Sequence, residues 1–273
     1  MTPGLRPWRD RLLAAIGPSM NGLGRALGGG TMPADLTFEL VKDGPRAVSV
    51  SVGAGPRQAH LKVYDGPDAS DRYSRERGIL LALRGKGLVA PLILFSDQMN
   101  LLVTETMGPP LSVTHLSDWG PQNFGRALGT WLARYDMCAP SREGGGDWYT
   151  HVRQHCPELR VDRLADAAEV LKRVPVCGLI VAQNDAALGN FVIDDLDGLW
   201  RVDFEAAGLR PRGWDYVFMR HAVRQRHPDQ ADQILGAMSM AFDRAHRGAV
   251  VVGELDAVSE ALFSLTALRD RAA

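Results

Sequence analysis

Hydrophobic and polar residues alternate along three short segments in the first quarter of the chain, residues 36–42, 46–52 and 57–64. Two turns rich in glycine and proline, 43–45 and 53–56, separate them. Strict alternation bounded by such turns is typical of strands with one buried face. The pattern therefore predicts an antiparallel meander.

A helical pattern over about residues 71–84, ended by Gly85, follows the meander, and two further strands are predicted at 88–96 and 101–105. Before the meander, residues 6–16 resemble a short amphipathic helix, and a glycine-rich stretch around 28–30 is expected to be flexible. Three strands, a helix and two strands make a small α+β lobe.

The pattern changes at Gly108, where Met107-Gly108-Pro109-Pro110 interrupts regular structure. Helical periodicity dominates thereafter, with a short apolar strand and a hairpin between the helices. The helices are expected at 122–137, 161–173 and from Trp214 onward, the strand at 178–182, and the hairpin at 191–194 with 199–204. We therefore expect two domains: residues 1–108, a β-rich lobe with an N-terminal helical extension, and residues 109–273, a mainly helical lobe.

Composition narrows the function classes. The chain has 273 residues, 45% hydrophobic and 23% charged, with a formal net charge of −1, so no global field favours nucleic acid or anionic lipid. No apolar run reaches the ~18 residues of a membrane span, and the N-terminus does not resemble a signal peptide. Three widely spaced cysteines suggest no disulfide framework and favour a reducing cytoplasm. The oligomeric state cannot be inferred from the sequence.

Lys62 and Glu76 form the first candidate pair. Alternation in the third strand places Leu61 and Val63 on one face and Lys62 on the other. Glu76 falls on the apolar stripe of the following helix, and a carboxylate on a buried face is costly unless it is paired. The alternative is an exposed lysine and a glutamate at the edge of the helix. Only four of the 31 basic residues are lysine, so a lysine within a strand is less often incidental in this chain.

The second candidate group is Asp185, Asn190 and Asp203. A four-residue hairpin turn at 195–198 would pair Asp194 with Leu199 and set Asn190 opposite Asp203, with Cβ atoms roughly 4.5–5.5 Å apart. Amide and carboxylate oxygens are hard ligands that suit Mg²⁺. Asp185, five residues before Asn190, reaches the same opening and could accept a proton from a hydroxyl. Taken singly, each residue is more often a turn, strand-edge or solvated residue.

These residues carry a resemblance. The order is a lysine strand, a glutamate helix, the segment Thr104-Glu105-Thr106-Met107-Gly108, Asp-x4-Asn at 185–190 and Asp203 in Val-Asp-Phe-Glu. It resembles the aminoglycoside phosphotransferase/choline kinase family of the protein-kinase-like fold. The resemblance implies a two-lobed α+β fold and an ATP-dependent, magnesium-dependent kinase that acts on a hydroxyl of a small molecule.

The resemblance also implies a role for each matched residue. Lys62 would contact the α- and β-phosphates, and Glu76 would position it. The backbone of Glu105, Thr106 and Met107 would bind adenine. Asp185 would be the catalytic base, Asn190 and Asp203 the metal ligands, and Asp215 a structural brace of the catalytic loop. Gly44 lies where a phosphate-binding loop would be, although a plain hairpin turn fits it equally.

Two departures bear on activity and substrate. Gln183-Asn184 replaces the usual His-Gly before the catalytic aspartate, so a nucleotide-binding pseudokinase with a regulatory role is the alternative to an enzyme. A kinase acting on protein or on a lipid-linked sugar is a third reading. Residues 209–226 contain five arginines and one acidic residue, Asp215, which favours a neutral or anionic acceptor over a polycationic antibiotic.

Overall fold

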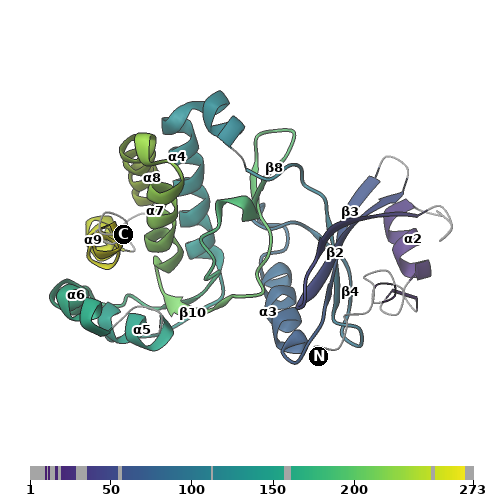
Figure 1. Cartoon of the computed structure of the whole chain (residues 1–273), viewed down its shortest axis with the longest axis horizontal. Helices are drawn as coiled ribbons and strands as arrows, with labels where there is room; N and C mark the ends of the chain where they lie inside the picture. Colours follow the sequence, from purple (N-terminus) through teal and green to yellow (C-terminus); the bar gives the residue numbers. More distant parts are fainter. Residues whose placement is uncertain are drawn as a thin grey trace, which may run out of the picture. The chain divides into compact units, whose positions relative to one another are not determined.

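The computed structural model describes residues 10, 12, 16–17, 20–28, 36–54, 57–111, 113–156, 161–246 and 250–267. The chain divides into two compact units (Figure 1). The first comprises Met1–Pro109 and Trp200–Ala206, and the second comprises Pro110–Leu199 and Ala207–Ala273. A single boundary near Gly108 therefore does not describe the division, because Trp200–Ala206 returns to the first unit.

A five-stranded antiparallel sheet forms the first unit, with strand order β1-β2-β3-β5-β4. The bounds of the first three strands differ from the sequence prediction by no more than two residues. β4 begins later than predicted, and Val89 instead forms an isolated bridge with Arg201. The elements of this unit are α2 (Met20–Gly28), β1 (Thr37–Asp43), β2 (Ala47–Ala54), β3 (Arg57–Tyr64), α3 (Ala69–Ala82), β4 (Leu92–Ser96) and β5 (Leu101–Glu105).

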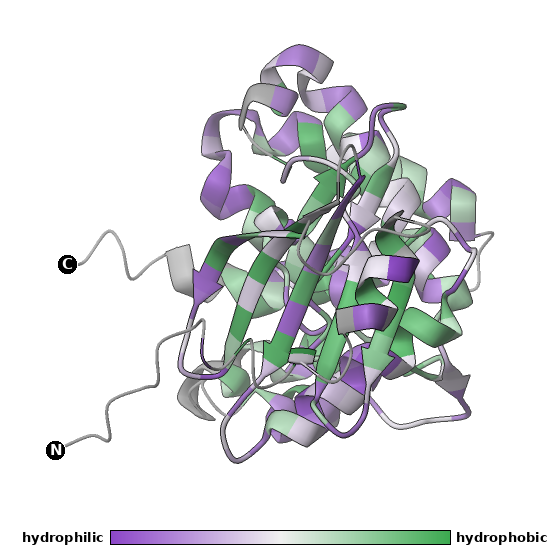
Figure 2. Cartoon of the chain, turned by 90° about the vertical axis from the view of Figure 1, so that its right-hand side faces the viewer, coloured by the Kyte–Doolittle hydropathy of each residue, from purple (hydrophilic) through white to green (hydrophobic). Residues whose placement is uncertain are grey.

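Helices lie on both faces of this sheet, α2 on one and α3 on the other (Figure 1). Leu23 and Leu27 of α2 belong to the same buried cluster as Val50, Leu61 and Val103 of the sheet. Hydrophobic residues recur along these strands (Figure 2). One face of the sheet packs against α2, so the opposite face of β3 is directed toward α3. Lys62 lies on this opposite face.

The helix α2 was not predicted, because three glycines in nine residues obscure its apolar spacing. Leu23 and Leu27, four residues apart on one face, are buried. Gly28, expected to be in a flexible stretch, ends this helix. Most of the helix expected at 6–16, and Gly29 and Gly30, lie outside the described residues.

The second unit is mainly helical, and its three predicted helical regions are confirmed. No helix in the described part of the chain is long and apolar enough to cross a membrane. A three-stranded sheet of order β10-β7-β6 lies among the helices. The elements are α4 (Val113–Cys138), β6 (Ser141–Arg142), α5 (Trp148–His155), α6 (Val161–Arg173), β7 (Leu179–Ala182), η3 (Leu188–Asn190), β8 (Phe191–Ile193), β10 (Gly208–Pro211), α7 (Trp214–Arg226), η4 (Pro228–Gln230), α8 (Ala231–His246) and α9 (Val252–Ala267), with β9 (Leu199–Arg201) at the boundary of the units.

The helices α4 and α8 pack at close range through two glycines of α4. A Cβ atom at Gly125 would clash with the carbonyl of Ile234, and one at Gly129 with the carbonyl of Met238. α4 begins nine residues earlier than the predicted 122–137 and bends at Gly120, where φ is 73°. The proline that follows this glycine lacks an amide hydrogen, which accounts for the bend.

Asp136, near the end of α4, holds the turn before α7. Its carboxylate accepts hydrogen bonds from the Gly213 amide at 2.8 Å, Arg212 Nη1 at 3.2 Å and His246 Nε2 at 2.5 Å. The Asp136 side chain is 5% exposed, and the His246 side chain is fully buried. Since Asp215 lies two residues after Gly213, this buried network fixes the start of the helix that supports the candidate catalytic loop.

Candidate active site

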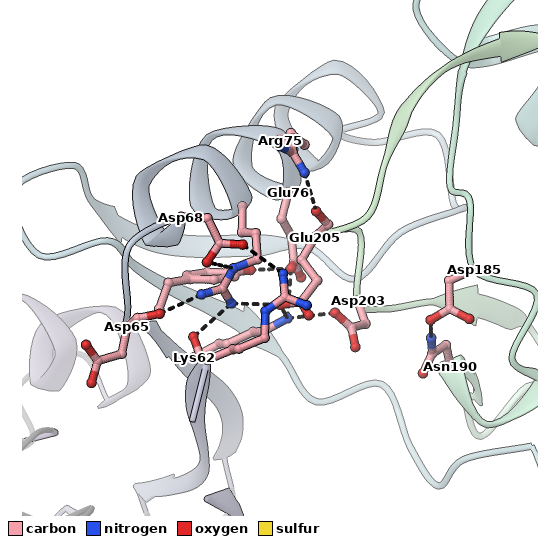
Figure 3. A network of polar contacts seen from close by, with 12 residues as sticks. Lys62, Asp65, Asp68, Arg75, Glu76, Asp185, Asn190, Asp203 and Glu205 are labelled. Carbon is pink, nitrogen blue, oxygen red and sulfur yellow. Dashed lines mark hydrogen bonds and ion pairs between the residues drawn. The ribbon is translucent and has the colours of Figure 1, made fainter. Parts of the chain in front are cut away.

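Lys62 lies at the centre of a cluster of carboxylates in the first unit (Figure 3). Its Nζ donates to Glu76 Oε2 at 3.0 Å and to Asp203 Oδ1 at 2.7 Å. Glu205 Oε2 forms a third ion pair with the same nitrogen at 3.2 Å. The predicted Lys62–Glu76 pair is therefore confirmed, and the lysine side chain is only 11% exposed.

Three neighbouring carboxylates keep the Lys62 ammonium charged. Burial alone would lower its pKa, but the attraction of Glu76, Asp203 and Glu205 outweighs burial and raises the pKa above the usual lysine value. The group is a fixed cation at every physiological pH. Such a cation suits an anionic ligand that displaces part of the carboxylate shell.

Tyr64 and Arg72 complete this cluster, and sequence reasoning missed both. The Tyr64 hydroxyl donates to Glu76 Oε2, and Lys62 Nζ lies 4.8 Å from the centre of the Tyr64 ring. Arg72 is 1% exposed and donates to the carbonyls of Arg46 at 2.8 Å and Asp65 at 2.6 Å. Neither residue stood out in the sequence, because a tyrosine in a strand and an arginine in a helix are common and usually face the core or the solvent.

Glu205 is held from α3 by two arginines. Arg72 Nη1 lies 3.5 Å from Glu205 Oε2, and Arg75 Nη1 donates to the Glu205 carbonyl at 3.3 Å (Figure 3). Asp203, two residues earlier, has a left-handed backbone with φ 65°. Few non-glycine residues adopt this conformation, although aspartate and asparagine tolerate it better than most, and such residues are enriched at functional sites. Two residues later, the contacts of Glu205 with α3 hold this segment.

In the second unit, Asp215 supports the loop that carries Asp185. The loop follows β7, and Asp215 lies in the first turn of α7. Its two carboxylate oxygens accept hydrogen bonds from the Gln183 amide at 2.8 Å and the Asn184 amide at 3.0 Å. The expected bracing role of Asp215 is thus confirmed, and it acts on the backbone, so Gln183-Asn184 can replace His-Gly without loss of these bonds.

Asn184 has φ 67°, in the left-handed region. A glycine adopts this conformation freely, and asparagine is among the side chains that tolerate it best. The asparagine therefore fits a position where the resembled family has glycine.

Asp185 and Asn190 contact each other within the second unit (Figure 3). Asn190 Nδ2 donates to Asp185 Oδ2 at 2.7 Å, and the Ala187 amide donates to Oδ1 at 3.0 Å. The short η3 turn, in which the Asn190 amide donates to the Ala187 carbonyl at 3.1 Å, brings the two side chains together. These two donors orient the Asp185 carboxylate.

The hairpin register inferred from the sequence is wrong. The Asp194 amide donates to the Gly198 carbonyl at 3.0 Å, so the loop has three residues, 195–197, rather than four. Asp197 takes the left-handed conformation with φ 59°, as such a loop requires. β9 ends at Arg201, so Asp203 lies beyond the end of the strand.

The two remaining candidate segments lie in the first unit. Glu105 ends β5, and regular structure stops at Thr106 and Met107, where the Thr106 amide donates to the Gln58 carbonyl at 3.4 Å. Gly44 lies in the turn between β1 and β2. Its amide donates to the Ala47 carbonyl at 3.1 Å, so a phosphate contact there would have to replace this bond.

Metal-ligand clusters rich in histidine, cysteine or carboxylate are absent from the described residues: no three such side chains are placed to hold an ion. The His151 and His155 rings stack 6.1 Å apart on α5 without a third ligand. Asp203 in the first unit and Asn190 in the second each carry a side-chain oxygen of the hard type that Mg²⁺ accepts. Mg²⁺ takes few protein ligands and draws the rest from phosphate and water.

No protein-family model matches the sequence, and no curated protein matches it. Solved structures do match over most of the chain. The macrolide 2′-phosphotransferase of Brachybacterium faecium matches with a TM-score of 0.63 and 14% identity, over 91% of this chain and 89% of that one. An aminoglycoside-3′-phosphotransferase of type VIII matches with a TM-score of 0.57 and 14% identity, over 90% of this chain and 98% of that one.

An ethanolamine kinase of Plasmodium vivax matches with a TM-score of 0.56 and 13% identity, over 86% of this chain and 76% of that one. Identities this low establish architecture and leave the activity open. The fold predicted from the lysine strand, the glutamate helix and the Asp-x4-Asn loop is confirmed: the chain has the two-lobed α+β fold of the aminoglycoside and macrolide phosphotransferases and the ethanolamine kinases.

Proposed function

We propose that this chain is an ATP-dependent phosphotransferase that transfers the γ-phosphate to a hydroxyl of a small molecule. The observation that carries the proposal is the Lys62 ammonium, held by Glu76 on one side and Asp203 on the other in a chain with this fold. A buried cation held by carboxylates is suited to phosphate binding, since phosphoryl transfer depends mainly on positioning and charge neutralisation. No disulfide joins Cys138, Cys156 and Cys177, which fits a reducing, cytoplasmic setting.

In this proposal each unit contributes its own residues. Lys62, positioned by Glu76, contacts the α- and β-phosphates, and Asp203 binds magnesium. The backbone of Glu105, Thr106 and Met107 binds adenine. Bound Mg²⁺ neutralises charge on the transferring phosphoryl group.

The second unit supplies Asp185 as the base that accepts the proton of the acceptor hydroxyl. Its carboxylate is oriented by Asn190 Nδ2 and by the Ala187 amide. We assign Asn190 a second role as a metal ligand. Its side-chain oxygen would bind the metal, because the bond to Asp185 uses only the side-chain nitrogen. Asp215 keeps the loop in place through two backbone bonds and takes no part in proton transfer.

The test is Mg-ATP binding by calorimetry together with ADP release in the presence of pooled metabolites. Wild-type protein is expected to bind Mg-ATP and to release ADP with at least one pool, whereas Asp185→Asn binds but does not turn over. The proposal would be contradicted if wild-type protein bound no Mg-ATP and Asp203→Ala left every measured property unchanged. Binding without turnover that Asp185→Asn leaves unchanged would favour the regulatory pseudokinase.

A further inference from the structure

A pocket of about 130 Å³ lies within the second unit, beside the loop that carries Asp185. Two lining residues, Asn184 and Ala186, flank Asp185 in the sequence, so the pocket adjoins the proposed base. Its walls come from the end of α5, the catalytic loop and the start of α7. The lining residues are His155, Cys156, Asn184, Ala186, Trp214, Asp215 and Phe218.

Arg210 of β10 contacts two of the residues that line this pocket, Asn184 and Trp214. Its Nε donates to Asn184 Oδ1 at 3.0 Å, and its guanidinium carbon lies 5.6 Å from the centre of the Trp214 ring. Nη1 donates to the Leu209 carbonyl at 2.7 Å. Within the described residues, no bond from Nη2 is found, so two of the five guanidinium hydrogens have no protein acceptor there.

The side chain of Asn184 is what holds Arg210. Glycine is the usual residue at this left-handed position of the resembled family, and it could not make the bond. Asn184 thus joins β10 to the catalytic loop. Its backbone tolerates the positive φ of this position, and its amide oxygen accepts the hydrogen bond from Arg210. The guanidinium plane is fixed on one side by this bond and on another by Leu209.

Two opposite charges act at this pocket: the Asp215 carboxylate, which lines it, and the Arg210 guanidinium, with which Asp215 interacts electrostatically. The carboxylate of Asp215 already accepts two backbone hydrogen bonds. Burial, followed by the positive charge of Arg210, lowers the pKa of His155, so this imidazole is neutral at pH 7. Arg210 keeps its charge at this pH, because a guanidinium does not lose its proton in proteins.

Three of the other arginines of residues 209–226 do not add to this charge as the sequence suggested. Arg212 pairs with Asp136 at 3.2 Å, and Arg220 pairs with Asp256 at 2.8 Å. Arg224 pairs with Glu260. Three members of the cluster are thus neutralised by acidic residues from other parts of the chain, and Arg210 is the member found in contact with residues that line the pocket.

We propose that Arg210, oriented by Asn184, binds an anionic group of the phosphate acceptor, so that the substrate is a small hydroxylated anion carrying a carboxylate or a phosphate. The planar guanidinium forms two parallel hydrogen bonds with either group. The inference that the bound anion is the phosphate acceptor rests on the proposed function, but the anion site itself requires no catalysis.

The test compares matched probes in calorimetric titrations without nucleotide: glucose, glucose 6-phosphate, gluconate and glucosamine. Wild-type protein is expected to bind at least one anion about tenfold or more tightly than glucose, and glucosamine no better than glucose. Arg210→Gln should abolish the preference for the anion, whereas Arg210→Lys should retain part of it. Arg226→Gln, which removes an exposed arginine of α7, is the matched control and should keep the preference.

A purely structural role for Arg210 would lower the melting temperature of Arg210→Gln but leave the ratio of anion to neutral affinity unchanged, and that result overturns the proposal. So does failure of both anions to bind wild-type protein. ADP release with these probes is measured separately. If no probe is phosphorylated but the Arg210-dependent anion preference persists, the proposed kinase activity fails and the anion site stands.

Discussion

Lys62 is the residue for which the consequences of substitution are most direct. Its ammonium is shared by Glu76, Asp203 and Glu205, and the side chain is 11% exposed. Lys62→Met removes the cation but keeps most of the side-chain volume. We expect Mg-ATP-dependent phosphotransfer to fall by about 100-fold or more, as when one preorganised charge donor is removed from an active site.

Lys172→Met is the matched control, because Lys172 is exposed in the last turn of α6 and the substitution is identical. Its activity should equal that of the wild type. Initial rates of ADP release at saturating acceptor measure both. Equal activity of Lys62→Met and Lys172→Met would remove the proposed phosphate-binding role.

Single residues show how far sequence reasoning about the site could go. Lys62 and Glu76 were predictable as a pair because Glu76 lies on the apolar stripe of its helix and needs a cation, and Lys62 lies only 14 residues earlier in the chain. Glu205 was not, since its partners Arg72 and Arg75 lie 133 and 130 residues away along the chain. Ion pairs between distant segments depend on the tertiary arrangement, which no local pattern encodes.

At the scale of elements, the contact of α4 with α8 depends on glycine. Gly129→Ala would drive a methyl group into the Met238 carbonyl, so the helices must separate. We expect the free energy of unfolding to fall by roughly 1–3 kcal/mol, as in other overpacked interiors. Urea unfolding followed by circular dichroism measures the change.

Gly236→Ala in α8 is the matched control, because a Cβ atom at this position would meet nothing within 4 Å. Alanine is the better helix former by roughly 1 kcal/mol, so this variant should be more stable than wild type. Opposite signs for the two variants support close packing through Gly129. Equal stabilisation by both would show that α4 and α8 do not approach this closely.

The pairing of α7 with α9 predicts an effect of acid. Hydrogen bonds from Arg224 and then Arg220 lower the pKa of Glu260 below its usual 4.5. A depressed carboxylate pKa contributes stability that is complete above the unfolded-state pKa and is lost as the pH falls through the folded-state value. Glu260→Gln should therefore be less stable than wild type at neutral pH, and the difference should shrink below pH 4.5.

Thermal unfolding from pH 7 down to pH 3 checks this, with Glu169→Gln as control, since that exposed glutamate pairs with an exposed arginine in its own helix. A difference between wild type and Glu260→Gln that stays constant over this range would contradict the assignment.

Elements were predictable where one rule governed them. Alternation and turn residues placed β1, β2 and β3 within two residues, because a half-buried strand has a fixed period of two. β10 was missed, since Gly-Leu-Arg-Pro has no alternation and forms a strand only by pairing with β7. The hairpin loop was one residue shorter than assumed, because Asp197 adopts a left-handed conformation that the sequence did not signal.

For the molecule as a whole, the proposed function predicts how stability responds to ligands. A nucleotide that binds only the folded chain raises its stability by about 2.7 kcal/mol at 100 times the dissociation constant. A chain of this length should then gain roughly 5–10 °C in melting temperature. If Asp203 is a magnesium ligand, most of this gain must depend on the metal.

We therefore expect a non-hydrolysable ATP analogue to raise the melting temperature strongly with Mg²⁺ and weakly with EDTA. Asp203→Asn should respond weakly in both conditions, because an amide oxygen carries no charge for the cation. Asp195→Asn, an exposed aspartate in the hairpin loop between β8 and β9, should behave as wild type. Equal shifts with Mg²⁺ and with EDTA in wild-type protein would show that nucleotide binding needs no metal, and Asp203 would then serve only as a partner of Lys62.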